Sequence, residues 1–109
     1  MIPAPGIWKP VFRQATFGET PFHEVKHGEI DVLVINEDGT GYAEHPKLFK
    51  VVHHELTCLE TDDPNLCIIG IPEQKLTMLA TIDEHGNLLA KWECKSIAFN
   101  NYGVVYERQ

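Results

Sequence analysis

Turn signals divide this chain into short segments that are rich in strand-forming residues. Clusters of Pro, Gly, Asn and Asp recur at residues 3–6, 17–21, 37–39, 63–65, 85–87 and 100–101. Over the whole chain, Val, Ile, Thr, Phe, Tyr and Trp supply 34 of the 109 residues, whereas Ala supplies only 6. This spacing predicts an all-β sandwich or barrel. The expected strands are at about 7–14, 22–26, 30–36, 40–44, 48–53, 55–61, 66–71, 74–83, 87–95 and 97–107.

Length and charge exclude several classes of protein. A chain of 109 residues with 43% hydrophobic and 23% charged residues predicts a single folded domain over residues 1–109. No apolar run approaches the roughly 18 residues of a membrane span, and the first residues do not resemble a signal peptide. We therefore expect a soluble, cytoplasmic protein. Its net charge of −7 disfavours binding to nucleic acid or to anionic membranes.

The segment around Glu84, His85 and Gly86 predicts a β-hairpin with a three-residue loop and a left-handed glycine. Pairing Asp83 with Asn87 fixes the register. The expected inner pairs are Ile82 with Leu88, Ala80 with Ala90, Met78 with Trp92 and Leu76 with Cys94, which form one apolar face. A slip of one residue would turn this whole face to solvent, so the register is strongly specified.

Two structures are compatible with residues 47–61. On a helical wheel the apolar residues Leu48, Val51, Val52, Leu56 and Leu59 share one side, which permits an α+β fold with one helix on an antiparallel sheet. Against a helix, residues 56–61 repeat the pattern of residues 76–81, which belong to the predicted hairpin. A strand is therefore favoured, with a bend near His53 and His54.

Three short motifs resemble those of the calycin superfamily, and in particular its short bacterial lipocalin-like barrels. They are Gly6-Ile7-Trp8 near the start, residues 35–40 as an acidic-Gly-Thr turn, and Tyr106-Glu107-Arg108 at the end. The resemblance implies a small antiparallel up-and-down β-barrel that binds a small molecule. It further implies that Trp8 seals the closed end of the barrel and that Arg108 stacks across it.

The cysteines and histidines do not form a recognisable metal or redox motif. Cys58, Cys67 and Cys94 lack Cys-x-x-Cys spacing and are expected to be buried, reduced thiols. A turn over residues 63–66 would place Asp62 opposite Cys67 and leave Cys58 out of register with Cys67. The histidines have no ligand spacing, so we expect them to be exposed or hydrogen-bonded, with no metal and no cofactor. They are His23, His27, His45, His53, His54 and His85.

Two functions remain open. The first is a barrel that binds an apolar or aromatic small molecule, with Met78, Leu88, Trp92 and Tyr106 lining the site. The second is a solid barrel that acts by protein–protein interaction or self-association, for example as a homodimer. Apolar Leu79 and Leu89 on the polar face of the hairpin favour this alternative. Without a catalytic motif, the sequence favours a non-enzymatic role over an enzymatic one.

Overall fold

The computed structural model describes residues 2–17, 20–22, 31–47, 50–93 and 101–109. Turn signals and alternating apolar residues divide this part of the chain into strands joined by short connections, with one turn of 3-10 helix. The elements are β1 (Gly6–Phe17), β2 (Thr20–Phe22), β3 (Val32–Ile35), β4 (Thr40–Lys47), β5 (Lys50–Glu60), β6 (Leu66–Ile71), η1 (Pro72–Gln74), β7 (Leu76–Ile82), β8 (Leu88–Glu93) and β9 (Asn101–Arg108).

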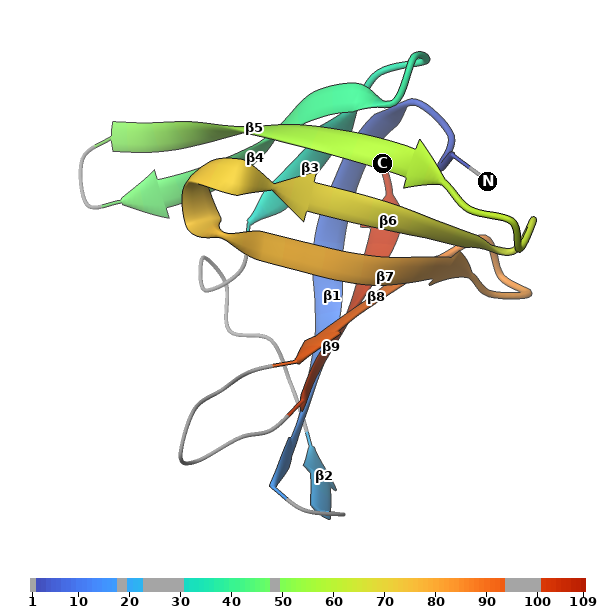
Figure 1. Cartoon of the computed structure of the whole chain (residues 1–109). Coiled ribbons are helices and arrows are strands. Elements are labelled where there is room, and N and C mark those ends of the chain that lie inside the picture. Colours follow the sequence, from blue (N-terminus) through green and yellow to red (C-terminus); the bar gives the residue numbers. More distant parts are fainter. Residues whose placement is uncertain (1, 18–19, 23–30, 48–49, 94–100) are drawn as a thin grey trace.

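Eight of the strands form a closed antiparallel barrel (Figure 1). Their order is β1, β3, β4, β5, β6, β7, β8 and β9. From β3 onward each strand pairs with the next one in the chain, β1 pairs with β3 across the intervening β2, and β1 pairs with β9 to close the circle. β2 pairs only with the last residues of β1, where β1 and β9 extend away from the barrel. The predicted all-β up-and-down barrel is confirmed. No helix in the described part of the chain has the length and apolarity needed to cross a membrane.

The predicted hairpin between β7 and β8 is confirmed in its register. Ala80 pairs with Ala90 and Ile82 with Leu88, and Asp83 N donates to Asn87 O over 2.9 Å. Gly86 has φ of 79°, the left-handed conformation expected at this position. The described ladder ends at Leu79 with Lys91, one residue short of the predicted pair of Met78 with Trp92. The predicted partner of Leu76, Cys94, lies outside the described residues.

Residues 50–60 form the single strand β5, so the alternative helix over residues 47–61 is wrong, and so is the bend at His53 and His54. β5 pairs with β4 continuously, from Thr57 opposite Thr40 to Lys50 opposite Lys47. An unbroken ladder satisfies the backbone groups of both strands, which gives the chain no reason to bend between the two histidines. The same pairing extends β4 to Lys47, beyond the predicted end at residue 44.

The turn between β5 and β6 has the predicted position but not the predicted register. Leu66 N donates to Asp63 O over 3.1 Å, as expected for a turn over residues 63–66. Cys67, however, pairs with Glu60 instead of Asp62. The side chain of Thr61 accounts for the shift, because its hydroxyl bonds to Leu66 O at 2.9 Å and leaves residues 61 and 62 outside the ladder. Cys58 consequently lies opposite Ile69, not opposite Cys67.

The core consists of the inward-facing residues of every barrel strand. Burial alternates with a period of two along β6 and β7, which is the pattern of strands with one buried face. The buried hydrophobic residues are Trp8, Leu33, Ile35, Ala43, Leu56, Cys58, Cys67, Ile69, Ile71, Met78, Ala80, Leu88, Ala90, Val104 and Tyr106. Among the described residues, Cys58 and Cys67 are free buried thiols as predicted, while Cys94 lies outside them.

Candidate functional site

Trp8 lies buried near the start of β1, where it pairs with Leu33 on β3. This indole is 2% exposed, and its Nε1 donates to Ala4 O over 3.0 Å, which ties the N-terminal segment to the barrel. Trp8 pairs with Arg108 across β1 and β9, and Arg108 Nε donates to Pro5 O over 2.9 Å. Trp8 and Arg108 are thus cross-strand neighbours, while the closure of this end by Trp8 and a stack of the guanidinium on the indole stay predictions. Ile2 also packs against the core at this end.

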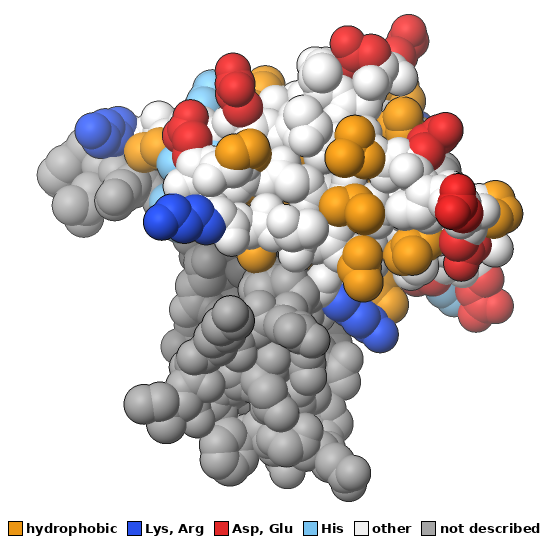
Figure 2. Space-filling view, viewed as in Figure 1, with side chains coloured by type: hydrophobic (Ala, Val, Ile, Leu, Met, Phe, Trp, Pro, Cys, Tyr) orange, Lys and Arg blue, Asp and Glu red, His pale blue; other side chains and the backbone are white. Residues whose placement is uncertain are grey.

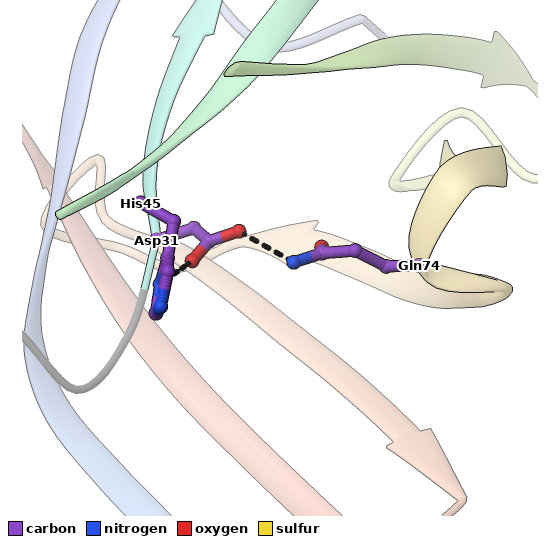
Figure 3. A network of polar contacts seen from close by, with 3 residues as sticks. All are labelled: Asp31, His45 and Gln74. Atoms are coloured by element: carbon purple, nitrogen blue, oxygen red, sulfur yellow. Dashed lines mark hydrogen bonds and ion pairs between the residues drawn. The ribbon is translucent and has the colours of Figure 1, made fainter. Parts of the chain in front are cut away.

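Farther down the barrel, polar groups face inward. Asp31, directly before β3, is the centre of this group (Figure 3). Its Oδ1 accepts a hydrogen bond from Nδ1 of His45 on β4 at 2.7 Å, and its Oδ2 accepts one from Nε2 of Gln74 on η1 at 3.0 Å. The Asp31 side chain is 13% exposed and that of His45 is 33% exposed. Three separate elements thus hold one carboxylate in a fixed orientation.

Strand register explains why these residues meet. The β3–β4 pairing of Val32 with Glu44 continues to Asp31 with His45, and His45 in turn pairs with Val52. Paired residues share one face of a sheet, so Asp31 and His45 lie on the same face, where the hydrogen bond joins them. Gln74 belongs to the turn that follows β6, and η1 packs against β5. This brings its amide within reach of Asp31 although 43 residues separate them.

A second imidazole–carboxylate pair lies beside the first. His54 Nδ1 bonds to Glu73 Oε2 at 2.8 Å, and the exposed fractions of these side chains are 18% and 59%. His54 pairs with Ala43, a buried residue, which identifies its face of β5 as the inner one. His53 points outward, where its ring stacks on Tyr42 with centroids 4.7 Å apart. The adjacent histidines therefore have different environments, and only His54 belongs to the polar group inside the barrel.

Tyr106 connects this polar group to the apolar core. Its side chain is 2% exposed, and it pairs with Pro10 on β1 and with Leu88 on β8. Continuing the β1–β3 register beyond Trp8 with Leu33 brings Asp31 level with Pro10, and hence close to Tyr106. Burial raises the pKa of the Tyr106 phenol above its ordinary value, and the negative charge of Asp31 raises it further. The phenol is therefore a neutral hydroxyl at physiological pH, beside a carboxylate.

The predicted ligand-binding residues divide into three cases. Leu88 and Tyr106 are buried cross-strand partners, so the structure brings them together. Met78 is buried on β7, but Leu88 pairs with Ile82, four residues farther along that strand, or ~13 Å. The structure describes only the backbone at Trp92, which pairs with Tyr102. A separate shallow depression, open to solvent, lies at residues 5–7 and 34–38 near Trp8 and contains none of the four.

Sequence reasoning missed Asp31, His45 and Gln74 as a group. The general expectation for the histidines is confirmed where they are described: His45 and His54 are hydrogen-bonded, and His53 and His85 are exposed. His23 and His27 lie outside the described residues. The available signal was the register between β3 and β4, since a hairpin over the turn at residues 36–40 places Asp31 opposite His45.

The geometry suits recognition of a polar group. With its proton held on Nδ1 by Asp31, a neutral His45 ring has Nε2 as an acceptor, and in the protonated ring Nε2 is a donor. Tyr106 adds a hydroxyl and Gln74 an amide from the other side of Asp31. Within the described residues, no three His, Cys, Asp or Glu side chains are grouped closely enough to hold a metal ion.

Comparisons of the chain with protein-family models, with curated proteins and with solved structures found no match.

Proposed function

We propose that this protein is a lipocalin-like barrel that binds a small apolar or aromatic molecule carrying one polar group. The observation that supports it best is the contrast between the two parts of the barrel interior. Trp8 and its neighbours form an apolar core near the start of β1, whereas Asp31, His45 and Gln74 present a fixed polar group farther down. Ligand pockets typically combine an apolar wall with a few oriented polar groups.

The number of strands in the barrel agrees with this proposal. An eight-stranded barrel either fills with side chains or holds one small ligand. Ala43, Ala80 and Ala90 face inward on β4, β7 and β8, but all three are 0% exposed, so neighbouring side chains fill the space beside them and a ligand would have to displace those side chains. Leu88 and Tyr106 would contact the apolar part of the ligand, and the Nε2 atom of His45 its polar group.

A titration followed by tryptophan fluorescence tests the proposal. The probes are anilinonaphthalene sulfonate, a medium-chain fatty acid and an aromatic amide, each added to the wild type and to two variants. We expect saturable binding in the wild type and at least ~10-fold weaker binding in His45→Ala, because one hydrogen bond to a buried polar group contributes about 1.5 kcal/mol.

His53→Ala is the matched control for His45→Ala, because it also removes an imidazole. His53 lies on the outer face of β5 and is not part of the polar group. Trp8→Phe and Trp92→Phe variants identify which indole reports the binding. The proposal fails if no probe gives a saturable response, or if His53→Ala weakens binding as much as His45→Ala does.

A self-associating role is the second candidate, and one feature of the outer surface favours it. Leu79, which the sequence singles out on the polar face of the hairpin, is 51% exposed, and Leu59 on β5 is 58% exposed.

A further inference from the structure

His45 has the hydrogen-bond arrangement of a general base. Asp31 holds its Nδ1 atom at 2.7 Å, and Gln74 holds the other oxygen of that carboxylate at 3.0 Å. Figure 3 shows this chain of contacts, which fixes the orientation of the imidazole ring. A carboxylate on Nδ1 favours the tautomer whose Nε2 atom carries the lone pair, and it stabilises the imidazolium that forms when Nε2 accepts a proton.

Exposure differs between this histidine and the carboxylate that orients it. The His45 side chain is 33% exposed, although it lies on the inner face of β4, and the Asp31 side chain is 13% exposed. A base must contact its substrate, whereas an orienting carboxylate acts best where water and salt screen its charge less. The two exposures therefore suit these two roles.

Tyr106 supplies a hydroxyl on the other side of Asp31. It pairs with Pro10, and Asp31 is level with Pro10 on β3. The Tyr106 side chain is 2% exposed, and within the described part of the chain its hydroxyl has no hydrogen-bond partner. A buried hydroxyl without a partner costs about 1–3 kcal/mol, so this group favours a ligand that accepts a hydrogen bond. Burial and the charge of Asp31 raise the pKa of the phenol, which therefore keeps its proton and donates.

We propose that His45 and Tyr106 catalyse proton transfer at the carbon next to the carbonyl group of an apolar or aromatic ketone. This inference rests on the proposed function, because the ketone is the small molecule and its carbonyl is the polar group. The imidazole and the phenol flank Asp31, so one can contact the C–H bond while the other contacts the oxygen.

The reaction needs no other reactant. Nε2 of His45 takes the proton from the α-carbon, the electron pair of the broken C–H bond forms a C=C bond, and the π pair of the carbonyl moves onto oxygen. The enolate oxygen accepts a hydrogen bond from Tyr106, which stabilises its negative charge. The imidazolium then returns its proton to the same carbon or, in an unsaturated ketone, to the γ-carbon, which moves the double bond.

Deuterium exchange into β-tetralone, followed by proton NMR in deuterium oxide, tests the proposal. β-Tetralone is an aromatic ketone with acidic C–H bonds beside its carbonyl. We expect saturable exchange by the wild type, at least ~100-fold faster than with an equal concentration of free imidazole. His45→Gln keeps a polar side chain that cannot act as a base, so the rate at saturating ketone should fall at least ~100-fold.

Two controls leave the inner site intact. His53→Ala removes an imidazole from the outer face and should keep the wild-type rate. Leu79→Ser changes a residue that is 51% exposed on that face, where Figure 2 shows hydrophobic side chains gathered over β5, β6 and β7. It should also keep the wild-type rate, which separates proton transfer from association through the outer face.

Two further variants separate catalysis from structural support. Tyr106→Phe removes the hydroxyl and should lower the rate at saturation at least ~10-fold without lowering the melting temperature. Asp31→Asn keeps the shape of the positioning residue but removes its charge, so kcat should fall at least ~10-fold while KM changes less than ~3-fold. A purely structural Asp31 would instead lower the melting temperature and leave kcat unchanged in the protein that stays folded.

Exchange no faster than with free imidazole, or equal rates in the wild type and in His45→Gln, overturns the proposal. The fluorescence titrations of the proposed function distinguish the two failures. Saturable binding of their probes without exchange of β-tetralone means that the barrel binds small molecules and does not catalyse proton transfer. Absence of both binding and exchange removes the proposed function as well.

Discussion

Consecutive residues on one strand lie on opposite faces of the barrel wall. Met78 is 1% exposed inside the barrel, and Leu79, the next residue, is 51% exposed outside. The alternation of side chains along a strand is the whole cause, since the two residues have similar hydrophobicity. It also explains why the hairpin could be assigned from sequence alone: one register keeps Met78, Ala80 and Ile82 on a common face.

The burial of Met78 makes a direct prediction about stability. Met78→Asp would place a carboxylate without a partner in an apolar core, which we expect to lower the free energy of unfolding by at least ~3 kcal/mol. Thr77→Asp is the matched control because Thr77 is exposed on the same strand, and it should cost less than ~1 kcal/mol. Urea denaturation followed by circular dichroism measures both. Similar losses in the two variants would contradict the described faces of β7.

At the scale of whole elements, pairing with neighbouring strands determines the secondary structure and the register of segments whose local sequence pattern is ambiguous. The apolar spacing of residues 47–61 fits both a helix and a strand, and only continuous pairing with β4 and β6 decides for β5. The sequence around the adjacent residues His53 and His54 does not indicate which of the two side chains faces into the barrel. The side chain of Thr61 shifts the β5–β6 register by two residues from the predicted one, and turn propensities alone do not predict such a shift.

The close approach of β3 and β4 predicts that position 41 tolerates only glycine. A Cβ added to Gly41 would lie 1.9 Å from Val34 O on the adjacent strand, far inside contact distance. Gly41→Ala must therefore push the two strands apart, and we expect a loss of at least ~2 kcal/mol in the free energy of unfolding.

Gly86→Ala provides the comparison for Gly41→Ala. A Cβ at Gly86 meets nothing within 4 Å, so the cost there is only that of a left-handed φ of 79°, about 1 kcal/mol. Thermal unfolding of the two variants beside the wild type measures the difference. A smaller loss for Gly41→Ala than for Gly86→Ala would show that β3 and β4 are not held this closely.

At the scale of the whole molecule, barrel closure unites residues that the sequence keeps far apart. β1 pairs with β9, and Gln109 N donates to Ile7 O over 2.8 Å, so both ends of the chain complete the same wall. Closure also brings Tyr106 close to Asp31, because the registers of β1 with β9 and with β3 place both residues level with Pro10. Tyr106 was predicted as a ligand-binding residue, but its polar neighbours were not, because no local motif connects residues 31, 45, 74 and 106.

The buried cysteine thiols and the buried tyrosine phenol inside the barrel predict how the stability of the whole fold depends on pH. Burial, with a smaller contribution from the nearby Cys67, raises the pKa of the Cys58 thiol from 9.0 to about 12. Burial likewise raises the pKa of Cys67 and of Tyr106. In the folded state these groups keep their protons, whereas the unfolded chain releases them at ordinary pKa values. Their contribution to stability is therefore complete below pH ~9 and is lost as the pH rises from ~9 toward ~12.

Urea denaturation at pH 8 and at pH 10.5 measures this loss. For Cys58 alone, an unfolded pKa of 9.0 gives a decrease of about 2 kcal/mol in the free energy of unfolding between these two conditions. Cys58→Ala removes the thiol, so its stability should differ less between pH 8 and pH 10.5 than that of the wild type, whatever its absolute value. Lysine titration and the growing negative charge act on both proteins and cancel in this comparison. Cys58 is buried on β5 between β4 and β6. An equal pH dependence in the wild type and in Cys58→Ala would contradict the prediction, because the thiol would then ionise as readily in the folded barrel as in the unfolded chain.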